Sequence, residues 1–475
     1  MYGAVAAGHP VTAETGASVL RDGGNAVDAL LAAAFAAFVA EGPLTGPTGG
    51  GFLLVHEPDG ATSVLDCFFA APTGTLGPME EVVIDFADAG TQTFHVGVGS
   101  VAVPGLLHGL VDAHRRYASR PWAELVEPAI GLAQEGFVRD ERRSFLHEIL
   151  APILLRDEGG RRVYGNPERV VTEELAATLE RIRDVGAEAV FELLPELEDD
   201  LAAYRVAAVE PLAAAVDGFD VFATPPPSRG GAIVLEILTS LAALSSWSLH
   251  DEARAIGLAY DASAGRLTGT THISVVDGSG RAAGLSSTLG SGSGVFRGGC
   301  QLNNMLGELD VIGSEPRTSG DRLPSMMSPT LVLSDGRPRL VLGSAGSVRL
   351  AGAIAQVTRR VLRGSGVAEA IDAPRIHVEG SVLHLEGGWA DDVTLRLSDA
   401  WDVVRWSGRN LFFGGVSAVE RRPDGTLAAA GDPRRGGLPA SPALSAVSAP
   451  ARARAPARPG RRHRGRRRSP PSCRR

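Results

Sequence analysis

The chain has 475 residues, of which 44% are hydrophobic, and its formal net charge is −9. This composition is typical of a globular protein with a substantial buried core, and it excludes a largely disordered chain. All 46 basic residues are arginine, which excludes pyridoxal-phosphate chemistry through a Schiff-base lysine and a phosphate-loop lysine.

Positive charge is concentrated at the C-terminal end. Residues 451–475 contain 11 arginines and no acid, so the other 450 residues together carry a formal charge of −20. An acidic body argues against general affinity for nucleic acid. Residues 441–475 are predicted to form a disordered, arginine-rich tail, and only this tail has the charge to contact nucleic acid or anionic lipid.

Metal, disulfide and membrane signals are missing from the sequence. Cys67, Cys300 and Cys473 are scattered, and the 11 histidines show neither HExxH nor HxH spacing, so no metal and no cofactor is expected. No segment has the length and hydropathy of a transmembrane helix. Residues 1–10 lack the basic and apolar regions of a secretory signal, so we expect a cytoplasmic protein, unless the N-terminus is truncated.

The first half of the chain alternates between helix-like and strand-like patterns, which predicts a mixed α and β fold. Residues 11–38 predict two helices that meet at Gly23 and Gly24, with Asn25 as N-cap of a second helix buried on nearly all sides. The glycines at 49–51 precede a strand rather than a helix. They are therefore interpreted as a close backbone approach and not as a phosphate cradle.

Further elements follow in order. A strand is predicted over 61–69, mainly helical structure over 122–215, a proline stop and helix over 222–238, and a helical stretch over 245–265. From Thr270 onward the pattern changes to strands and tight turns. A helix is predicted from about Ser347, strands at about 374–378 and 382–386, and the end of the ordered body near Gly437.

A β-hairpin is predicted where this second half begins. Residues 271–277 and 281–288 flank a Gly-Ser-Gly loop of a length typical of hairpins. If the strands pair directly across this loop, Thr270 falls opposite Thr288 with the two Cβ atoms about 5 Å apart. A bulge would shift that pairing by one residue. Two hydroxyl groups are thus expected at the open end of the hairpin, just after Gly269.

A threonine hydroxyl is a weak nucleophile until a base takes its proton. His272, expected on the same face of the strand, is one candidate base for Thr270. Cleavage of the Gly269–Thr270 bond would supply another, the freed α-amine of Thr270, whose ordinary pKa is near 8. Glycine before the bond tolerates a strained backbone and leaves its carbonyl open to attack. Threonine is also common in strands for packing reasons, and the spacing alone leaves that alternative open.

Several short motifs occur in a fixed order: GGNAVDA, TGGGFLLVH, VAVPG, PPSRGG, TTHISVVDGSG, QLNNM, MSPTLVL and LGSAGS. In this order and spacing they resemble the γ-glutamyltransferase family of N-terminal nucleophile hydrolases, over nearly all of residues 6–437. The resemblance implies an αββα sandwich and self-cleavage before Thr270. The implied products, which stay in one fold, are a large fragment, 1–269, and a small fragment from Thr270 onward, made of a small-subunit region, 270–440, and the predicted tail.

The resemblance also implies roles for catalytic residues. Thr270 matches the nucleophile, and Thr288 matches a second threonine that hydrogen-bonds it. Gly346 and Ser347 fall where the family has a glycine pair whose backbone N–H groups form the oxyanion hole, a task that a serine N–H also performs.

The implied substrate-binding positions differ from the family. Phe68 stands in place of an arginine that binds the substrate α-carboxylate, and a phenyl ring cannot make that bidentate contact. Glu308 replaces an aspartate that holds the substrate amino group, Met326 replaces a serine, and Gly290 replaces an asparagine. The substrate-binding set that the resemblance implies is Phe68, Asn304, Glu308, Ser325 and Met326.

Two alternatives for specificity follow. Either Arg322 replaces the missing arginine, or the acyl group is not γ-glutamyl and is more apolar, which would suit Phe68 and Met326. The substrate is expected to be a small amide or peptide, with hydrolysis and acyl transfer both open. An alternative of another class is a non-catalytic scaffold or binding protein. Asp66 and Glu41 are single acids for which surface or capping roles are expected.

Overall fold

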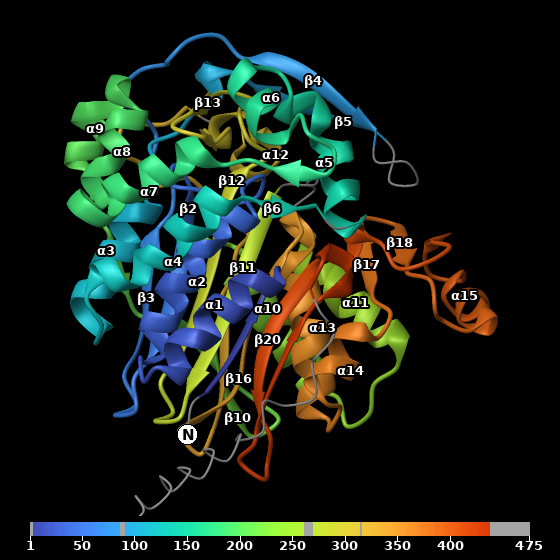
Figure 1. Ribbon diagram of the computed structural model, residues 1–475. Coiled ribbons are helices and arrows are strands. Elements are labelled where there is room, and N and C mark those ends of the chain that lie inside the picture. The colour runs from blue at the N-terminus through green and yellow to red at the C-terminus, as the bar shows by residue number, and fades with distance from the viewer. Residues whose placement is uncertain (1–2, 86–90, 140, 261–268, 314–315, 438–475) are drawn as a thin grey trace, which may run out of the picture.

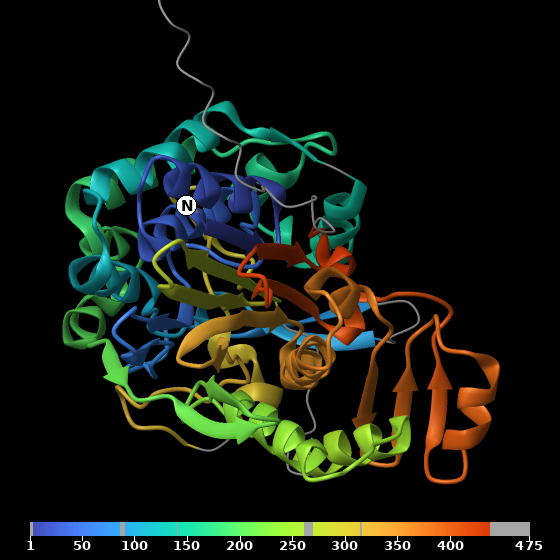
Figure 2. The ribbon, with the colours of Figure 1, turned by 90° about the horizontal axis from the view of Figure 1, so that it is seen from below.

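The computed structural model describes residues 3–85, 91–139, 141–260, 269–313 and 316–437. Two six-stranded sheets lie face to face in the middle of the molecule, with helices outside each of them (Figures 1 and 2). The predicted αββα sandwich is confirmed. The arginine-rich tail predicted for 441–475 lies outside the described residues.

The first sheet joins segments from both halves of the chain. All of its neighbouring strands are antiparallel. Its order is β1 (Gly3–Ala7), β11 (Gly269–Asp277), β12 (Ala282–Gly290), β2 (Gly50–His56), β3 (Thr62–Cys67) and β8 (Ala207–Val209).

The second sheet is also antiparallel throughout and also combines both halves. Its order is β21 (Leu427–Gly431), β20 (Gly415–Arg421), β16 (Arg337–Ala345), β15 (Thr330–Ser334), β10 (Phe219–Ala223) and β9 (Leu212–Val216).

Each sheet is covered on its outer side by helices that are rich in alanine, leucine and valine. The first sheet packs against α1 (Pro10–Arg21), α2 (Ala26–Ala40), α3 (Leu106–Tyr117), α4 (Trp122–Glu135) and α7 (Glu173–Val185). The second sheet packs against α10 (Gly230–Ala242), α11 (Leu249–Tyr260), α13 (Leu350–Leu362) and α14 (Val367–Asp372).

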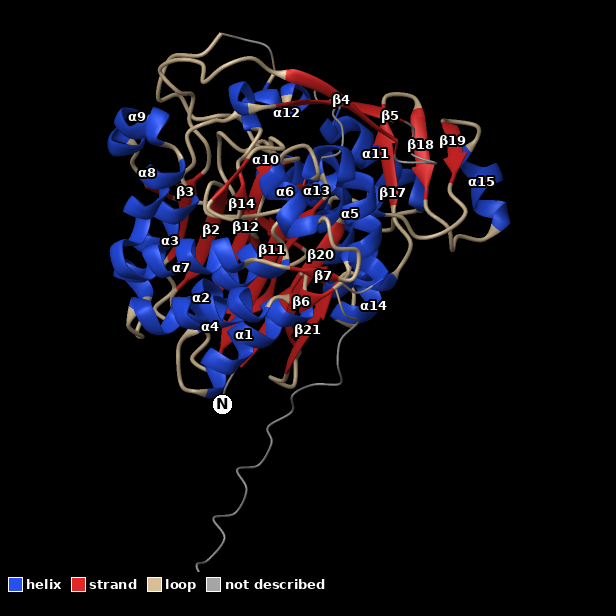
Figure 3. Ribbon diagram, turned by 45° about the horizontal axis from the view of Figure 1, so that its top comes forward, coloured by secondary structure: helices blue, strands red, loops and turns tan. Residues whose placement is uncertain are grey.

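Smaller elements surround the sandwich. A three-stranded sheet with α15 projects at one side (Figure 3). The strands of this sheet are β17 (Ile376–Glu379), β18 (Val382–Leu385) and β19 (Asp402–Arg405). Three further pairs of strands form two-stranded sheets: β4 (Glu80–Asp85) with β5 (Thr91–Val96), β6 (Phe137–Val138) with β7 (Arg169–Val170), and β13 (Phe296–Arg297) with β14 (Cys300–Gln301). The remaining α-helices are α5 (Glu141–Leu154), α6 (Glu158–Tyr164), α8 (Ala189–Leu193), α9 (Glu198–Ala203), α12 (Leu309–Ile312) and α15 (Asp391–Leu397).

Helix α2 forms as the sequence predicts. The Asn25 side chain accepts the N–H groups of Val27 and Asp28, and the Asp28 carboxylate accepts the N–H of Asn25, which is a complete capping box. Every residue of α2 is buried. The helix therefore packs on all sides, and its inner side supports β11 and β12.

The predicted hairpin pairing is confirmed over most of its length. Cα partners run from Val276 with Ala282 to Thr271 with Ser287, as direct pairing across the loop requires. At the open end a bulge shifts the ladder, and Gly269 pairs with Gly290. Thr270 is therefore not directly opposite Thr288, because the bulge inserts one extra residue there.

The sequence analysis missed two edge strands. β8 lies inside the range 122–215, which was predicted to be mainly helical, and β9 starts inside that range and ends one residue beyond it. Their sequences, Ala-Ala-Val and Leu-Ala-Ala-Ala-Val, favour helix by composition, but each strand completes the edge of a sheet by pairing with β3 or β10. The predicted helical stretch 245–265 is α11 up to Tyr260, and residues 261–265 of it lie outside the described residues.

Candidate active site

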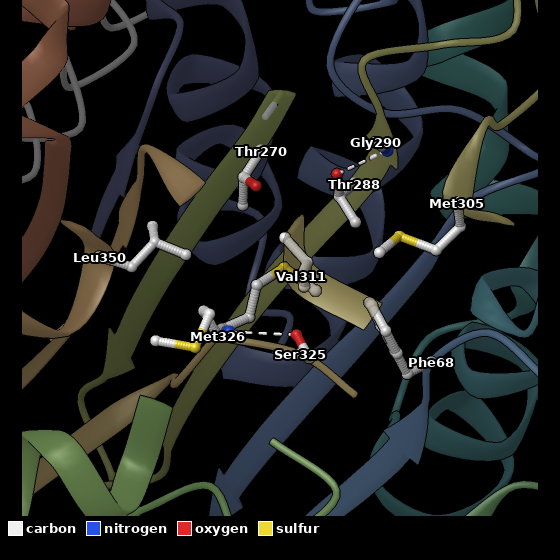
Figure 4. A pocket seen from close by; sticks show the side chains of 10 residues that line it. Phe68, Thr270, Thr288, Gly290, Met305, Val311, Ser325, Met326 and Leu350 are labelled. Carbon is white, nitrogen blue, oxygen red and sulfur yellow. Dashed lines mark hydrogen bonds between the residues drawn. The ribbon is translucent and has the colours of Figure 1, made fainter. Parts of the chain in front are cut away.

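Thr270 lies at the start of β11 and points into a small pocket, while Thr288 reaches the same space from β12 (Figure 4). The pocket has an empty volume of about 290 Å³. Its lining is mostly apolar and comes from strands of the first sheet, from loops and short helices beside it, and from the start of α13: Phe68, Thr270, Thr288, Gly290, Met305, Val311, Ser325, Met326, Met327 and Leu350. The fold therefore places around one pocket five residues that the sequence analysis assigned to the site: Thr270, Thr288, Phe68, Ser325 and Met326.

The hydroxyl of Thr288 donates a hydrogen bond to the carbonyl oxygen of Gly269 and accepts one from the N–H of Gly290 at 2.8 Å. In the intact chain it thus contacts the bond before Thr270 and not the Thr270 hydroxyl. A donor on this oxygen withdraws electron density from the Gly269 carbonyl carbon, which favours nucleophilic attack on it.

His272 is not placed to act as a base for Thr270. One ring nitrogen bonds the Ser286 hydroxyl at 2.8 Å and the other bonds the Ser274 hydroxyl at 2.9 Å. Burial lowers the pKa of His272 to about 3, so the ring is neutral. The ring lies between the two sheets against Gly343 of β16, and its role is to support β11.

Glu308 and Asn304 hold the turn at the mouth of the pocket. The N–H of Ser291 is within 2.7 Å of both Glu308 Oε1 and Asn304 Oδ1, and the Ser291 hydroxyl donates to the same Glu308 oxygen at 2.7 Å. Burial raises the pKa of Glu308 to about 7. Neither side chain lines the pocket itself; both lie behind Gly290.

Gly290, predicted to replace an asparagine, has a physical reason to be glycine. Its φ is +70°, and a Cβ there would lie 2.2 Å from Asn304 Oδ1 and 3.0 Å from Glu308 Oε1. A side chain at this position would collide with the two residues that hold the turn. The packing of Asn304 and Glu308 at the mouth of this pocket therefore leaves no space for a side chain at residue 290.

Phe68 forms one wall of the pocket. It stacks on Phe52 with ring centroids 5.3 Å apart and meets Phe69 edge-on at 4.9 Å. Its backbone N–H donates to Asp66 at 2.9 Å. Asp66 is only 5% exposed, so the expected surface position is wrong, although its carboxylate does cap this turn.

Arg322 is held away from the pocket. It donates to the Phe68 carbonyl at 3.1 Å, lies 3.6 Å from Asp66 Oδ2, and stacks over the Tyr204 ring at 4.1 Å. A further hydrogen bond reaches the carbonyl of Arg205. These contacts use Arg322 to support the Phe68 turn, and it is not among the residues that line the pocket.

Comparison with known proteins gives the chain a family. The sequence model of the gamma-glutamyltranspeptidase family matches residues 12–193 and 258–441. The chain belongs to this family. A relative with 29% identity, over 92% of this chain and 93% of its own, is the acylase ACY 1 proenzyme of Pseudomonas sp. (strain SE83). The glutathione hydrolase proenzyme of Escherichia coli (strain K12) is 28% identical over 91% of this chain and 90% of its own.

Solved structures agree with the fold of the gamma-glutamyltranspeptidase family. The crystal structure of cephalosporin acylase from Bacillus halodurans superimposes with a TM-score of 0.80 at 22% identity, over 92% of this chain and 95% of that one. Both relatives above are named as proenzymes and as acylase or hydrolase. This chain is accordingly an enzyme of the family, acting by hydrolysis or transfer of an acyl group, and the scaffold alternative is set aside.

The candidate oxyanion residues lie beside the pocket. Gly346 has a φ of +134°, and Ser347 begins the short 3₁₀ helix Ser347–Arg349 that leads into α13. Leu350, just after this turn, lines the pocket, and Gly346 is not among the lining residues. A Cβ on Gly346 would lie 2.8 Å from Gly414 Cα, so this backbone is packed tightly against the loop before β20.

Sequence reasoning missed the role of Glu41. Its carboxylate accepts hydrogen bonds from the Thr271 hydroxyl and, at 2.7 Å, from the Thr12 hydroxyl. It is 6% exposed, so the expected surface position is wrong, although it does stand at the C-terminal cap of α2. The sequence signal was its place directly after a helix buried on all sides. Glu41 fixes the residue that follows Thr270.

The two cysteines within the described residues lie in the protein interior. Cys67 and Cys300 are buried and free, and burial raises the pKa of Cys300 to about 12. Cys473 lies outside the described residues. In the parts of the chain that the structure describes, no three or more His, Cys, Asp or Glu side chains are grouped to hold a metal ion, and no helix has the length and apolar character to cross a membrane.

Proposed function

We propose that the chain is a self-processing acylase that acts on amides of a largely apolar acyl group. The main support is the lining of the pocket beside Thr270, in which six of ten residues are apolar and none is charged. A γ-glutamyl group would bring an ammonium and a carboxylate into this space, and each would need a partner there. An aliphatic acyl group would instead gain from burial against Phe68, Met305 and Met326.

Activation is proposed to begin at the Gly269–Thr270 bond. The Thr270 hydroxyl attacks the Gly269 carbonyl carbon, an ester forms, and the bond to the Thr270 nitrogen breaks. Thr288 assists by donating to the Gly269 carbonyl oxygen. The break of that bond frees the α-amine of Thr270. Water then hydrolyses the ester, which restores the Thr270 hydroxyl and leaves one fragment, 1–269, that ends in the Gly269 carboxylate and a second fragment that begins at Thr270.

Turnover is proposed to use the same hydroxyl. The free amine of Thr270 takes the hydroxyl proton while the oxygen attacks the substrate amide carbonyl, and it then gives the proton to the leaving amine. Backbone N–H groups of Gly346 and Ser347 stabilise the oxyanion. The acyl group is carried as an ester on Thr270 until water or an acceptor amine removes it.

The remaining contacts support an acyl group other than γ-glutamyl. Phe68 occupies the position of the carboxylate-binding arginine, and Arg322 is already engaged with Asp66 and the Phe68 carbonyl. The resemblance implies that Glu308 binds an amino group, but one of its carboxylate oxygens already accepts hydrogen bonds from the N–H and the hydroxyl of Ser291. Phe68 and Met326 are therefore proposed to contact the acyl chain, with Ser325 at the polar edge of the pocket.

The test compares two p-nitroanilides of equal acyl length, pentanoyl and γ-glutamyl, with purified, cleaved enzyme. We expect a higher kcat/KM for the pentanoyl compound and no activity in Thr270→Ala. Preference for the γ-glutamyl compound would contradict the proposed acyl group. Activity that survives in Thr270→Ala would contradict the proposed nucleophile.

A further inference from the structure

A cluster of buried charges lies where the chain comes off β21. Three arginines in it each lie within hydrogen-bonding distance of a carboxylate, and Arg434 also contacts the carboxylate that pairs with Arg375. The pairs are Arg349 with Glu379 at 3.0 Å, Arg375 with Asp432 at 2.6 Å, and Arg434 with Glu386 at 2.6 Å. All three arginines are 5% exposed or less at their side chains, and Asp432 and Glu386 are equally buried, whereas Glu379 is 39% exposed.

Arg435 is the fourth arginine of this cluster, and it has no acid of its own. Among the described residues its guanidinium makes no hydrogen bond or ion pair, and its Nε is buried without a partner. The nearest acid, Asp432, is already bonded by Arg375 and Arg434. Burial lowers the pKa of Arg435 to about 10, which leaves it charged at neutral pH, and Arg349 adds further positive potential.

The Arg435 side chain lies next to the candidate oxyanion turn at Gly346. A Cβ on Gly415 would lie 2.7 Å from Arg435 Cδ, so the arginine stem passes directly over glycine backbone. Its Nη2 is 3.6 Å from the position that a Cβ on Gly346 would take. Arg435 as a whole is half-buried, and its buried Nε has no partner. A guanidinium that lacks an acid of its own beside reactive backbone is explained best by a ligand of opposite charge.

We infer that Arg435, with Arg349 behind it, binds a carboxylate that lies beside Gly346 during the reaction. A guanidinium matches a carboxylate through two parallel hydrogen bonds. Because the pocket is apolar and uncharged, the carboxylate belongs on the amine side of the scissile amide, as in an N-acylated amino acid. This substrate class rests on the proposed function. The other source of the same chemistry is the C-terminal carboxylate that cleavage would create on Gly269.

The first experiment separates charge from shape on the substrate. N-hexanoylglycine and N-hexanoylglycinamide have the same acyl chain and nearly the same size, but only the first carries a carboxylate. Wild-type enzyme is expected to prefer the acid, and Arg435→Met is expected to lose about tenfold or more of that preference while hydrolysis of the amide stays within about twofold. Arg396→Met, at an exposed side chain on α15, is the matched control and should change neither rate.

The second experiment addresses the Gly269 source. Arg435→Met is made in wild type and in the uncleavable Thr270→Ala chain, and the melting temperatures are compared. If Arg435 holds the Gly269 carboxylate, the substitution lowers the melting temperature of the cleaved protein only. If it holds a substrate, neither protein becomes less stable, because no contact within the chain is lost.

The outcomes are separable from those of the proposed function. If wild type hydrolyses neither compound, calorimetric binding of N-hexanoylglycine, which needs no turnover, still reports the site, and Arg435→Met should abolish it. The inference is overturned if Arg435→Met behaves like Arg396→Met in substrate preference, in binding and in the stability of the cleaved protein.

Discussion

Thr288 donates its hydroxyl hydrogen to the carbonyl oxygen of Gly269, the group that self-cleavage must attack. We expect Thr288→Ala to slow cleavage by roughly a hundredfold, since loss of one oxyanion donor typically costs this much. Thr288→Ser keeps the donor and should cleave at a rate close to that of wild type. The measurement is the time course of the full-length band on a denaturing gel. Equal rates for the alanine and serine variants would show that the hydroxyl has no part in cleavage.

Glu308 gives a pH prediction at the same scale. Its pKa is about 7 in the folded chain against an ordinary 4.5, so the folded state binds more protons than the unfolded state between these values. Stability must fall as pH rises through this window. Relative to Glu308→Gln, which keeps the acceptor oxygen for Ser291, wild type should lose on the order of 2–3 kcal/mol between about pH 5 and about pH 8. The measurement is the unfolding free energy of both proteins from urea titrations at each pH. A difference between wild type and Glu308→Gln that is the same at about pH 5 and about pH 8 would contradict the prediction.

Which residues could be found from the sequence depended on how far apart they are in the chain. Thr270 and Thr288 are joined by a short hairpin, so local pairing rules brought them together within one residue. Glu41 bonds a threonine 230 positions away, and no local pattern encodes that contact. The bulge at Gly269 was likewise foreseen only as an option, because ladder shifts depend on the strands that pack outside the hairpin.

At the scale of elements, the two sheets approach closely where β11 crosses β16. A Cβ on Gly343 would lie 2.3 Å from Nδ1 of His272, whose ring is fixed by Ser274 and Ser286. We therefore expect Gly343→Ala to destabilise the fold by about 1–3 kcal/mol and to lower activity by displacing β11. Gly131→Ala in α4, where an added Cβ meets nothing within 4 Å, is the control and should be neutral or slightly stabilising. Equal stability of the two variants in urea would contradict the proposed tight contact.

Helices and strands could be predicted from the sequence wherever the spacing of apolar residues and the capping or turn residues indicated the same element. Asn25 and the apolar run after it specified α2, and the Gly-Ser-Gly loop between two strand-like segments specified the hairpin of β11 and β12. Strands β8 and β9 could not be recognised, since their alanine-rich sequences have no strand preference and only a neighbouring edge gives them one. The apolar pocket was suggested by Phe68 and Met326, but Val311 and Leu350 came from segments outside the quoted motifs.

At the scale of the whole molecule, each of the two sheets contains strands of both proposed fragments. In one sheet β1 and β2 of the first fragment flank β11 and β12 of the second, and in the other sheet β10 pairs with β15. Separating the fragments would break both ladders and expose both cores. The fragments should therefore co-elute in native gel filtration and separate only in denaturant.

The most direct test of the central claim is the intact mass of freshly purified protein under denaturing conditions, for wild type and for Thr270→Ala. Wild type is predicted to give two masses, which together place the break between Gly269 and Thr270, and Thr270→Ala is predicted to give the full-length mass alone. An active wild-type protein of undivided full-length mass would contradict the account.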